Sequence, residues 1–395
     1  MRLMSFLGTG NYNETTYLFE NQSHQTRYVA CALASLAKPE EIHLIATTEA
    51  WNQHGKTLTQ ELSAAGQPVP QRVDVPTGGE SQQLWQMFEA IVEVIRTSSG
   101  SVLLDITHGF RMQPFFAAAC IQYVQSVLPN PPQIRVVYGE YRGSEQASPI
   151  WELTPFLEVL SWSRSLMMLL RTGQADEVAS ETEKLGRALN KELAGTGAKL
   201  GFSQLPKLAK AIQSFSDDFT TIRTGSLLTG KQPSAQHLYD VIEQTKGEVT
   251  QHLPALARVL EQVQAMVEPL RTGGARLSSA QGQRSLLALA RLYQKIGRYS
   301  EAISILREGW ITLNAPNDAD HPGPELDREA RKKQEGDWRQ SNRSLARSVT
   351  AMRNDIQHAG FNKQPKDLSW FQDQLTKLLE AWQAAVDSMD SSHPA

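Results

Sequence analysis

Residues 102–114 read VLLDITHGFRMQP, and this stretch decides the expected fold of the first part of the chain. It begins as an apolar strand and continues into a segment of polar and small residues, namely Asp105, Thr107, His108, Gly109 and Arg111. In open α/β sheets ligands lie at the carboxyl ends of strands, and the N-terminus of the next helix offers free N–H groups to an anion. The stretch therefore predicts a strand, then a loop that binds a ligand, then a helix.

Outward from this stretch, short β-rich runs alternate with amphipathic segments of helix length up to about residue 153. This alternation is typical of a parallel sheet flanked by helices, a Rossmann-like α/β fold. The predicted strands are 3–7, 42–47, 72–75, 102–107 and 134–141, with a sixth at 149–153. The predicted helices lie near 24–37, 51–64, 80–97 and 112–127.

The first predicted strand also ends in a small polar loop. Its candidate ligand-binding residues are Gly8, Thr9, Gly10 and Asn11, and Thr47 at the end of the second strand joins them. Glycine lets a backbone approach a ligand closely. The spacing departs from the dinucleotide fingerprint, because Asn13 stands where the third glycine would be. Two structural alternatives stay open, in which His108 only caps a helix and Asp105 is a buried structural carboxylate.

After Thr154 the pattern changes to helices alone, which predicts an all-α second part. We expect a Rossmann-like α/β domain over 1–154, a helical connecting region over 155–285 and a final helical domain over 286–395. Residues 286–310 resemble a single tetratricopeptide-type helical hairpin, with Gly297 and Tyr299 at its turn and Ala302 packing inside. The turn-rich segments 225–234 and 314–324 are predicted loops.

The informative run of the second part is SNRSLARSVTAMRNDIQHAGF, residues 341–361. Its apolar residues are spaced to form one helix face, namely Leu345, Val349, Met352 and Ile356. At 100° per residue, His358 points nearly opposite that face and Arg353 flanks its edge. The alternative is a solvated polar face that ends with Gly360 as the helix cap.

Arg353 and His358 suit RNA cleavage without a metal. A histidine can move the proton of the attacking 2′-OH, and an arginine can neutralise the charge on the phosphorane. Asn354 could bond a phosphate or orient the histidine. A five-residue offset turns the two side chains ~140° apart on one helix, so a two-fold dimer is expected to build one composite cleft.

Composition limits the partners. Lys and Arg number 39 against 42 Asp and Glu, so no global basic field would hold a long nucleic acid, and RNA binding must be local. The two cysteines, Cys31 and Cys120, argue against a disulfide framework. We find no signal peptide and no membrane span, and expect a cytoplasmic protein.

Two motifs resemble known families. Asp105-Ile-Thr107-His108-Gly109 is similar to the D-x-T-H-G motif of CARF domains, Rossmann-like sensors of cyclic oligoadenylates in CRISPR-associated proteins. The run from Arg353 to His358 is similar to the R-x4-H motif of HEPN ribonucleases. In this order, the chain resembles the CARF-plus-HEPN ancillary ribonucleases of type III CRISPR systems.

The resemblance implies that a homodimer, or a higher even oligomer, binds a cyclic oligoadenylate as its activator, favouring cyclic tetra-adenylate, and then cuts single-stranded RNA. It implies no other cofactor, no metal, no DNA and no membrane. Three rival interpretations stay open: a ring nuclease that degrades the cyclic oligoadenylate, a ligand-gated transcription regulator, and a non-enzymatic helical interaction protein. A regulator would need a helix-turn-helix with a basic recognition helix, which the sequence does not show.

Overall fold

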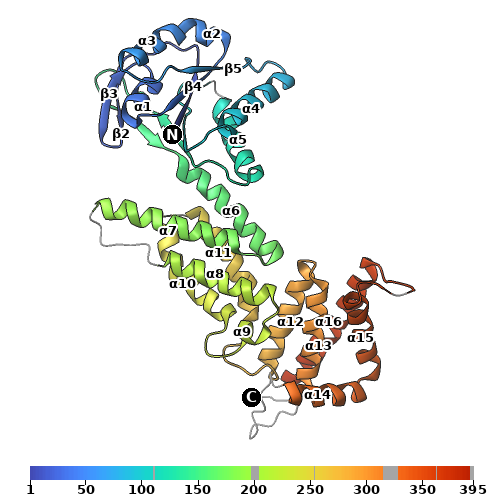
Figure 1. The fold of residues 1–395 in the computed structure, drawn as a ribbon. Coiled ribbons are helices and arrows are strands. Elements are labelled where there is room, and N and C mark those ends of the chain that lie inside the picture. The colour runs from blue at the N-terminus through green and yellow to red at the C-terminus, as the bar shows by residue number, and fades with distance from the viewer. Residues whose placement is uncertain (110–111, 197–203, 253, 315–327, 362, 392–395) are drawn as a thin grey trace. The chain divides into compact units, whose positions relative to one another are not determined.

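In the computed structural model of the chain, residues 1–395 are described except 110–111, 197–203, 253, 315–327, 362 and 392–395. Contacts divide the chain into two compact units, Met1–Ser161 and Trp162–Ala395. The first is α/β and the second is all helical (Figure 1). The division falls inside α6 (Thr154–Thr172), a helix that begins at the residue where the sequence pattern changes.

The first unit is built on one eight-stranded sheet with the strand order β3-β2-β8-β7-β6-β1-β4-β5. The strands are β1 (Arg2–Leu7), β2 (Thr15–Phe19), β3 (Gln22–Thr26), β4 (Glu41–Ala46), β5 (Gln71–Asp74), β6 (Val102–Asp105), β7 (Ile134–Gly139) and β8 (Ser148–Glu152). The five strands from β7 to β5 run parallel, as predicted.

The prediction of an all-parallel sheet is wrong at one edge. There β8 runs antiparallel to β7, and β3 runs antiparallel to β2. The β2–β3 hairpin turns at Glu20 and Asn21, which both have positive φ. Strand β3 (QSHQT) is mostly exposed and lacks apolar alternation, so its sequence carries no period-two signal. The helix predicted from residue 24 consequently begins only at Val29.

Helices cover both faces of the sheet. They are α1 (Val29–Ala37), α2 (Thr48–Ala50), the π-helical turn η1 (Trp51–Gly55), α3 (Lys56–Ala64), α4 (Ser81–Arg96) and α5 (Gln113–Val127). Leu3 and Leu7 of β1 pack in the core that includes α1 and α3, whereas Met4 and Phe6 pack in the core that includes α4 and α5. Successive side chains of a strand point to opposite faces, so this alternation produces three layers.

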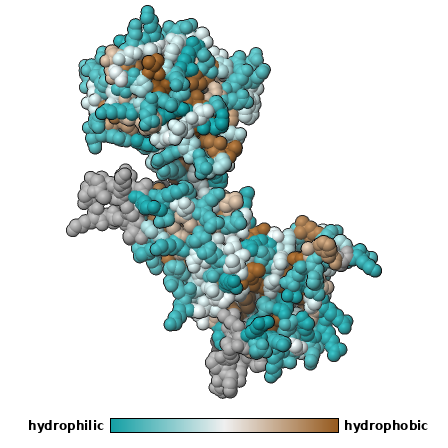
Figure 2. Space-filling view, in the orientation of Figure 1, coloured by the Kyte–Doolittle hydropathy of each residue, from teal (hydrophilic) through white to brown (hydrophobic). Residues whose placement is uncertain are grey.

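The second unit contains only helices among its described residues. They are α7 (Asp176–Thr196), α8 (Leu205–Thr220), α9 (Thr224–Leu228), α10 (Ser234–His252), α11 (Pro254–Val267), the 3-10 turn η2 (Glu268–Leu270), α12 (Ala280–Lys295), α13 (Tyr299–Leu313), α14 (Arg328–Ser341), α15 (Arg343–Gln357) and α16 (Leu368–Ser391). One hydrophobic core extends from Trp162 to Val386, across residue 285 without a break. Figure 2 shows hydrophobic surface of this unit gathered toward its C-terminal helices.

Two local predictions in this unit have clear outcomes. The hairpin predicted over 286–310 is confirmed as α12 and α13, with Gly297 at a φ of +79° and Ala302 fully buried. The loop predicted over 225–234 is wrong in part, because α9 occupies most of its first half and buries Leu227 and Leu228. Most of the loop predicted over 314–324 lies outside the described residues. Within the described ranges, no helix is long and apolar enough to span a membrane.

Candidate functional site

The loops after β1 and β6 meet at one edge of the sheet, because these two strands pair in parallel. Tyr12, from the loop after β1, is the centre of an aromatic cluster there. Its ring centroid lies 4.0 Å from that of His108 and 4.6 Å from that of His54, both at tilted angles. Tyr28 contacts the edge of the cluster at 5.7 Å from Tyr12. Residues from four separate segments therefore form one site.

Hydrogen bonds fix the orientation of His54. Its Nε2 lies 2.9 Å from the carbonyl oxygen of Gly10, and because a carbonyl can only accept, Nε2–H is the donor. A neutral ring then offers Nδ1 as an acceptor to the Tyr28 hydroxyl, 3.3 Å away. Burial lowers the pKa of His54, although the bond to Gly10 opposes the shift. The ring is therefore held neutral and ties the loop after β1 to η1.

His108 has a different surrounding. Its Nε2 is buried and has no hydrogen-bond partner among the residues that the structure describes. Burial, and secondly the nearby His54, lower the pKa of His108 to about 4. A buried polar atom without a partner is uncommon in native proteins. It is an unused hydrogen-bonding position at the edge of the sheet where ligands of α/β folds lie.

Close backbone approach explains one glycine of the loop. A Cβ atom on Gly8 would lie 2.5 Å from the carbonyl oxygen of His108, so no larger residue fits without moving a backbone. The N–H of Gly8 donates to the Tyr12 hydroxyl at 3.0 Å. Gly10 is more open, since its Cβ would meet only the Tyr12 ring at 3.4 Å.

Asp105 and Thr107 hold the loop after β6 together. Asp105 is fully buried, and one carboxylate oxygen accepts from the Ser5 hydroxyl while the other accepts from the N–H and hydroxyl of Thr107. The Thr107 hydroxyl in turn accepts from the N–H of Gly139 on β7, at 2.7 Å. Burial raises the pKa of Asp105 against the lowering effect of these bonds. These contacts account for both residues structurally, and their contact with a ligand stays a prediction.

Most of the other predicted ligand residues lie in loops at this same end of the sheet. Thr47 is buried and accepts from the N–H of Ala50, which makes it the N-cap of α2. It also lines a hollow of about 720 Å³ at the ends of β4 and β5. Gly109 lies against the Gln113 side chain, 2.8 Å from where its Cβ would be. Thr9 is half-buried, Asn11 is exposed, and Arg111 lies outside the described residues.

The second candidate site is the C-terminal end of α15. Val349 and Met352 are buried and Leu345 and Ile356 pack against the core, which confirms the predicted apolar face. His358 is exposed and is the C-cap residue. Its N–H donates to the carbonyl of Asn354, 2.9 Å away, and the Asn354 side chain is exposed.

Two residues with positive φ end this helix. Ala359 has a φ of 52° and Gly360 a φ of 69°, and the N–H of Gly360 donates to the carbonyl of Asp355 at 2.8 Å. Left-handed residues after the last turn are a common helix ending. The C-cap is therefore His358, and the prediction that placed it at Gly360 is wrong by two residues, although Gly360 does help to end the helix through its bond to Asp355.

Arg353 is half-buried and lies close to a charge network that the sequence did not indicate. Burial favours the neutral form of Glu335, but the bond and charge of Arg307, followed by the charges of Arg339 and Arg353, lower the pKa of Glu335 overall. Glu335 pairs directly with Arg307 and Arg339. Arg353 therefore lies beside a carboxylate of α14 that is itself already paired.

Sequence reasoning missed Tyr12, Tyr28 and His54. Tyr12 lies in the loop that drew attention, and its hydroxyl could have been considered as a partner for a loop N–H. His54 carried no local signal, because its position depends on the π-helical turn η1, which shifts the helix by one residue. Tyr28 lies just before α1, where the sequence predicted the interior of a longer helix.

Among the residues that the structure describes, no three His, Cys, Asp or Glu side chains gather where they could hold a metal ion. A scan of protein-family models and a search of curated proteins find no match. Among solved structures, Enterococcus italicus Csm6 bound to cyclic hexa-2'-fluoro-hexa-dAMP is similar to the chain, with 11% identity and a TM-score of 0.45. The match covers 100% of this chain and 95% of that one. At this score the likeness assigns neither a fold nor an activity.

Proposed function

We propose that the chain is a metal-independent endoribonuclease that a cyclic oligoadenylate activates and that cuts single-stranded RNA in type III CRISPR defence. The observation that carries the proposal is that one chain combines two sites of different kinds. A ligand-type cluster around Tyr12 and His108 lies at the ends of parallel strands, and an exposed histidine follows Arg353 at the end of α15.

The cluster suits an adenine-bearing anion. Aromatic rings offer faces for stacking against a base, and the unused Nε2 of His108 offers one hydrogen bond. Gly8 and Gly10 bring backbone close to the ligand, and Thr47 lies at the next strand end. A two-fold ligand would lie on the two-fold axis of a dimer, contacting each subunit in the same way.

The end of α15 suits transfer within RNA. The 2′-oxygen attacks the adjacent phosphorus while His358 takes its proton, and the bond from phosphorus to the 5′-oxygen breaks. The departing 5′-oxygen takes a proton from the second subunit's copy of the histidine. The Arg353 guanidinium stabilises the charge of the phosphorane, and Asn354 orients the phosphate. The products are a 2′,3′-cyclic phosphate and a 5′-hydroxyl.

Activation requires the cyclic oligoadenylate to bind the nuclease-competent state more tightly than the resting state. The test is incubation of the purified protein with a fluorescent single-stranded RNA, with and without cyclic tetra-adenylate or cyclic hexa-adenylate, in the presence of EDTA. We expect cleavage only with an activator and unchanged by EDTA. Loss of the cyclic oligoadenylate without RNA cleavage would instead identify a ring nuclease, and no chemistry at all would favour an interaction protein.

A further inference from the structure

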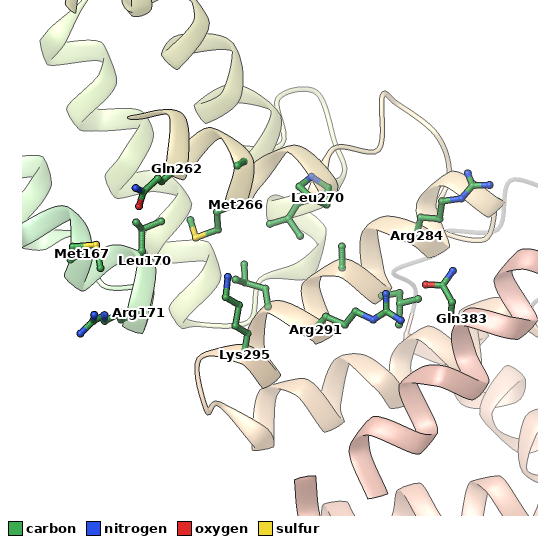
Figure 3. Close-up of a pocket in the computed structure, with 15 residues that line it drawn as sticks. Met167, Leu170, Arg171, Gln262, Met266, Leu270, Arg284, Arg291, Lys295 and Gln383 are labelled. Carbon is green, nitrogen blue, oxygen red and sulfur yellow. The ribbon is translucent and has the colours of Figure 1, made fainter. Parts of the chain in front are cut away.

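A groove of about 820 Å³ opens in the second unit between α6, α11, η2, α12 and α16. Its floor is aliphatic, made by Met167, Leu170, Met266, Leu270, Leu287 and Leu292. Four cationic side chains stand around it, namely Arg171, Arg284, Arg291 and Lys295. Figure 3 shows Lys295 extending from α12 toward Met266, and Arg171 placed on α6 across the opening. None of the described residues that line the groove carries a carboxylate or an aromatic ring.

Three of these cations lack a side-chain partner in the described part of the chain. Arg171, Arg291 and Lys295 have no acidic partner and no hydrogen-bond partner among the residues that the structure describes. Elsewhere in the same unit arginines are neutralised, since Arg298 pairs with Glu301 and Arg331 pairs with Glu308. The formal net charge of the chain is −3, so the chain has more than enough acidic residues to pair with its cations. Their absence from the lining leaves a local positive surface on a chain that has no global one.

The cations of α12 form a row. Arg284, Arg291 and Lys295 are separated by seven and four residues, which places them within ~20° of one face of the helix. At 1.5 Å per residue they cover a length of about 16 Å along the axis. A row of charges of this length matches an anion whose charges repeat, rather than one isolated phosphate.

We propose that this groove binds the sugar–phosphate backbone of single-stranded RNA and guides the substrate, an inference that rests on the proposed function. Arg171, Arg291 and Lys295 contact phosphates, and the aliphatic floor covers ribose and base surfaces. A duplex presents mainly its phosphates and 2′-hydroxyls, so it would leave the floor in contact with water. Without an aromatic ring the groove lacks the stacking that holds individual bases, so binding depends on salt and little on base identity.

The test measures equilibrium binding to the full-length His358→Ala variant, which keeps the RNA intact. A fluorescently labelled oligouridylate is titrated by anisotropy at a series of KCl concentrations. Each phosphate contact contributes about 0.7 to the slope of log K against log salt for single strands. Combining Arg171→Gln, Arg291→Gln and Lys295→Gln should therefore make the slope shallower by about 2. At low salt the combined groove variant should bind RNA roughly 100-fold more weakly, because each of three independent contacts contributes about fivefold.

The matched control removes three exposed cations outside the groove, by Lys207→Gln, Lys210→Gln and Lys377→Gln. The control variant has the same net charge as the groove variant. We expect its slope to differ from that of the parent by less than about 0.7, the contribution of one phosphate contact. Equal slopes in the groove and control variants would overturn the proposal. If the triple variant fails to fold, Arg291→Gln alone should still reduce the slope by about 0.7.

Two further outcomes identify other roles for the groove and overturn the proposal. If the parent bound polyglutamate and the groove variant did not, while both bound RNA equally, the groove would be a site for an acidic peptide. A lower melting temperature with an unchanged slope would show that Arg171 and Lys295, both in last helical turns, only stabilise helix ends. The cleavage assay tests the proposed function separately. If no activator elicits RNA cleavage but the salt slopes of the groove and control variants differ, the proposed function is wrong and the assignment of the groove as an RNA-binding surface is supported.

Discussion

The two candidate sites hold their histidines in opposite surroundings. His108 is packed against Tyr12 with a buried Nε2, and its pKa is lowered to about 4, so it is neutral at physiological pH. His358 follows the last turn of α15 and is exposed to water. A neutral, fixed ring suits recognition of a ligand, whereas an exposed ring at a surface suits contact with a polymer. The comparison predicts that changes at the two sites separate binding of the activator from chemistry.

The largest expected effect is at the end of α15. His358→Ala or Arg353→Ala should reduce activated RNA cleavage by about 10² to 10⁴-fold, the range of general acid–base catalysis for His358 and of electrostatic stabilisation of the transition state for Arg353. Since His358 is exposed, we expect the free energy of unfolding of His358→Ala and its affinity for the activator to stay unchanged. Cleavage rates at saturating cyclic oligoadenylate and a thermal melt measure these quantities.

Gln357→Ala is the matched control, because Gln357 is exposed one residue before His358 on the same helix end. It should cut RNA at nearly the wild-type rate. If His358→Ala also cut at that rate, or if EDTA abolished cleavage, the assignment of the nuclease site would be wrong.

The next effect concerns the stability of the first unit at acid pH. Burial, and secondly the nearby His54, lower the folded-state pKa of His108 from 6.5 to about 4. As the pH falls below 6.5, His108 takes up a proton in the unfolded chain before it does so in the folded chain. The contribution of His108 to the free energy of unfolding is therefore full above pH 6.5 and is lost as the pH falls toward 4. The loss from this residue should approach about 3 kcal/mol.

The measurement is urea unfolding of the wild type and of His108→Gln across that pH range. The variant should lose less stability between neutral pH and pH 4, while His43 and His54, whose pKa values are also lowered mainly by burial, contribute equally to both proteins. Parallel pH profiles would contradict the buried, neutral state of His108.

A smaller effect is expected on activator affinity. His108→Ala removes one hydrogen-bonding group from the proposed activator site, and the affinity for cyclic oligoadenylate should fall at least tenfold, about 1.4 kcal/mol. Cleavage should recover at saturating activator, because the change is far along the chain from the proposed nuclease residues. His24→Ala, on the outer strand β3, is the control and should bind normally. Wild-type affinity in His108→Ala would mean that the loop after β6 is only structural.

The two sites also differ in how much of each the sequence could predict. The face of α15 followed from Leu345, Val349, Met352 and Ile356 alone, because helical periodicity is local. The strand-end cluster depends on which strands pair, and β1 meets β6 across about a hundred residues of chain. The sequence predicted the loops of this site but not the contacts of the Tyr12 ring with His54 and His108. Likewise, Asp105 looked like a ligand residue, whereas its bonds to Ser5 and Thr107 appear only in the folded sheet.

The smallest expected effect separates the ring of Tyr12 from its hydroxyl. In Tyr12→Phe the ring remains beside His54 and His108, while the N–H of Gly8 loses its acceptor. One neutral hydrogen bond contributes about 1 kcal/mol, so stability should fall by that amount and activator affinity by no more than about fivefold. Tyr12→Leu, which also removes the aromatic ring in contact with His108, should lower the affinity for the activator further. Titration of cyclic oligoadenylate against both variants compares them. If Tyr12→Phe alone matched the loss in His108→Ala, the hydroxyl would have to contact the ligand itself, because an effect on the loop through Gly8 is too small to account for a tenfold change.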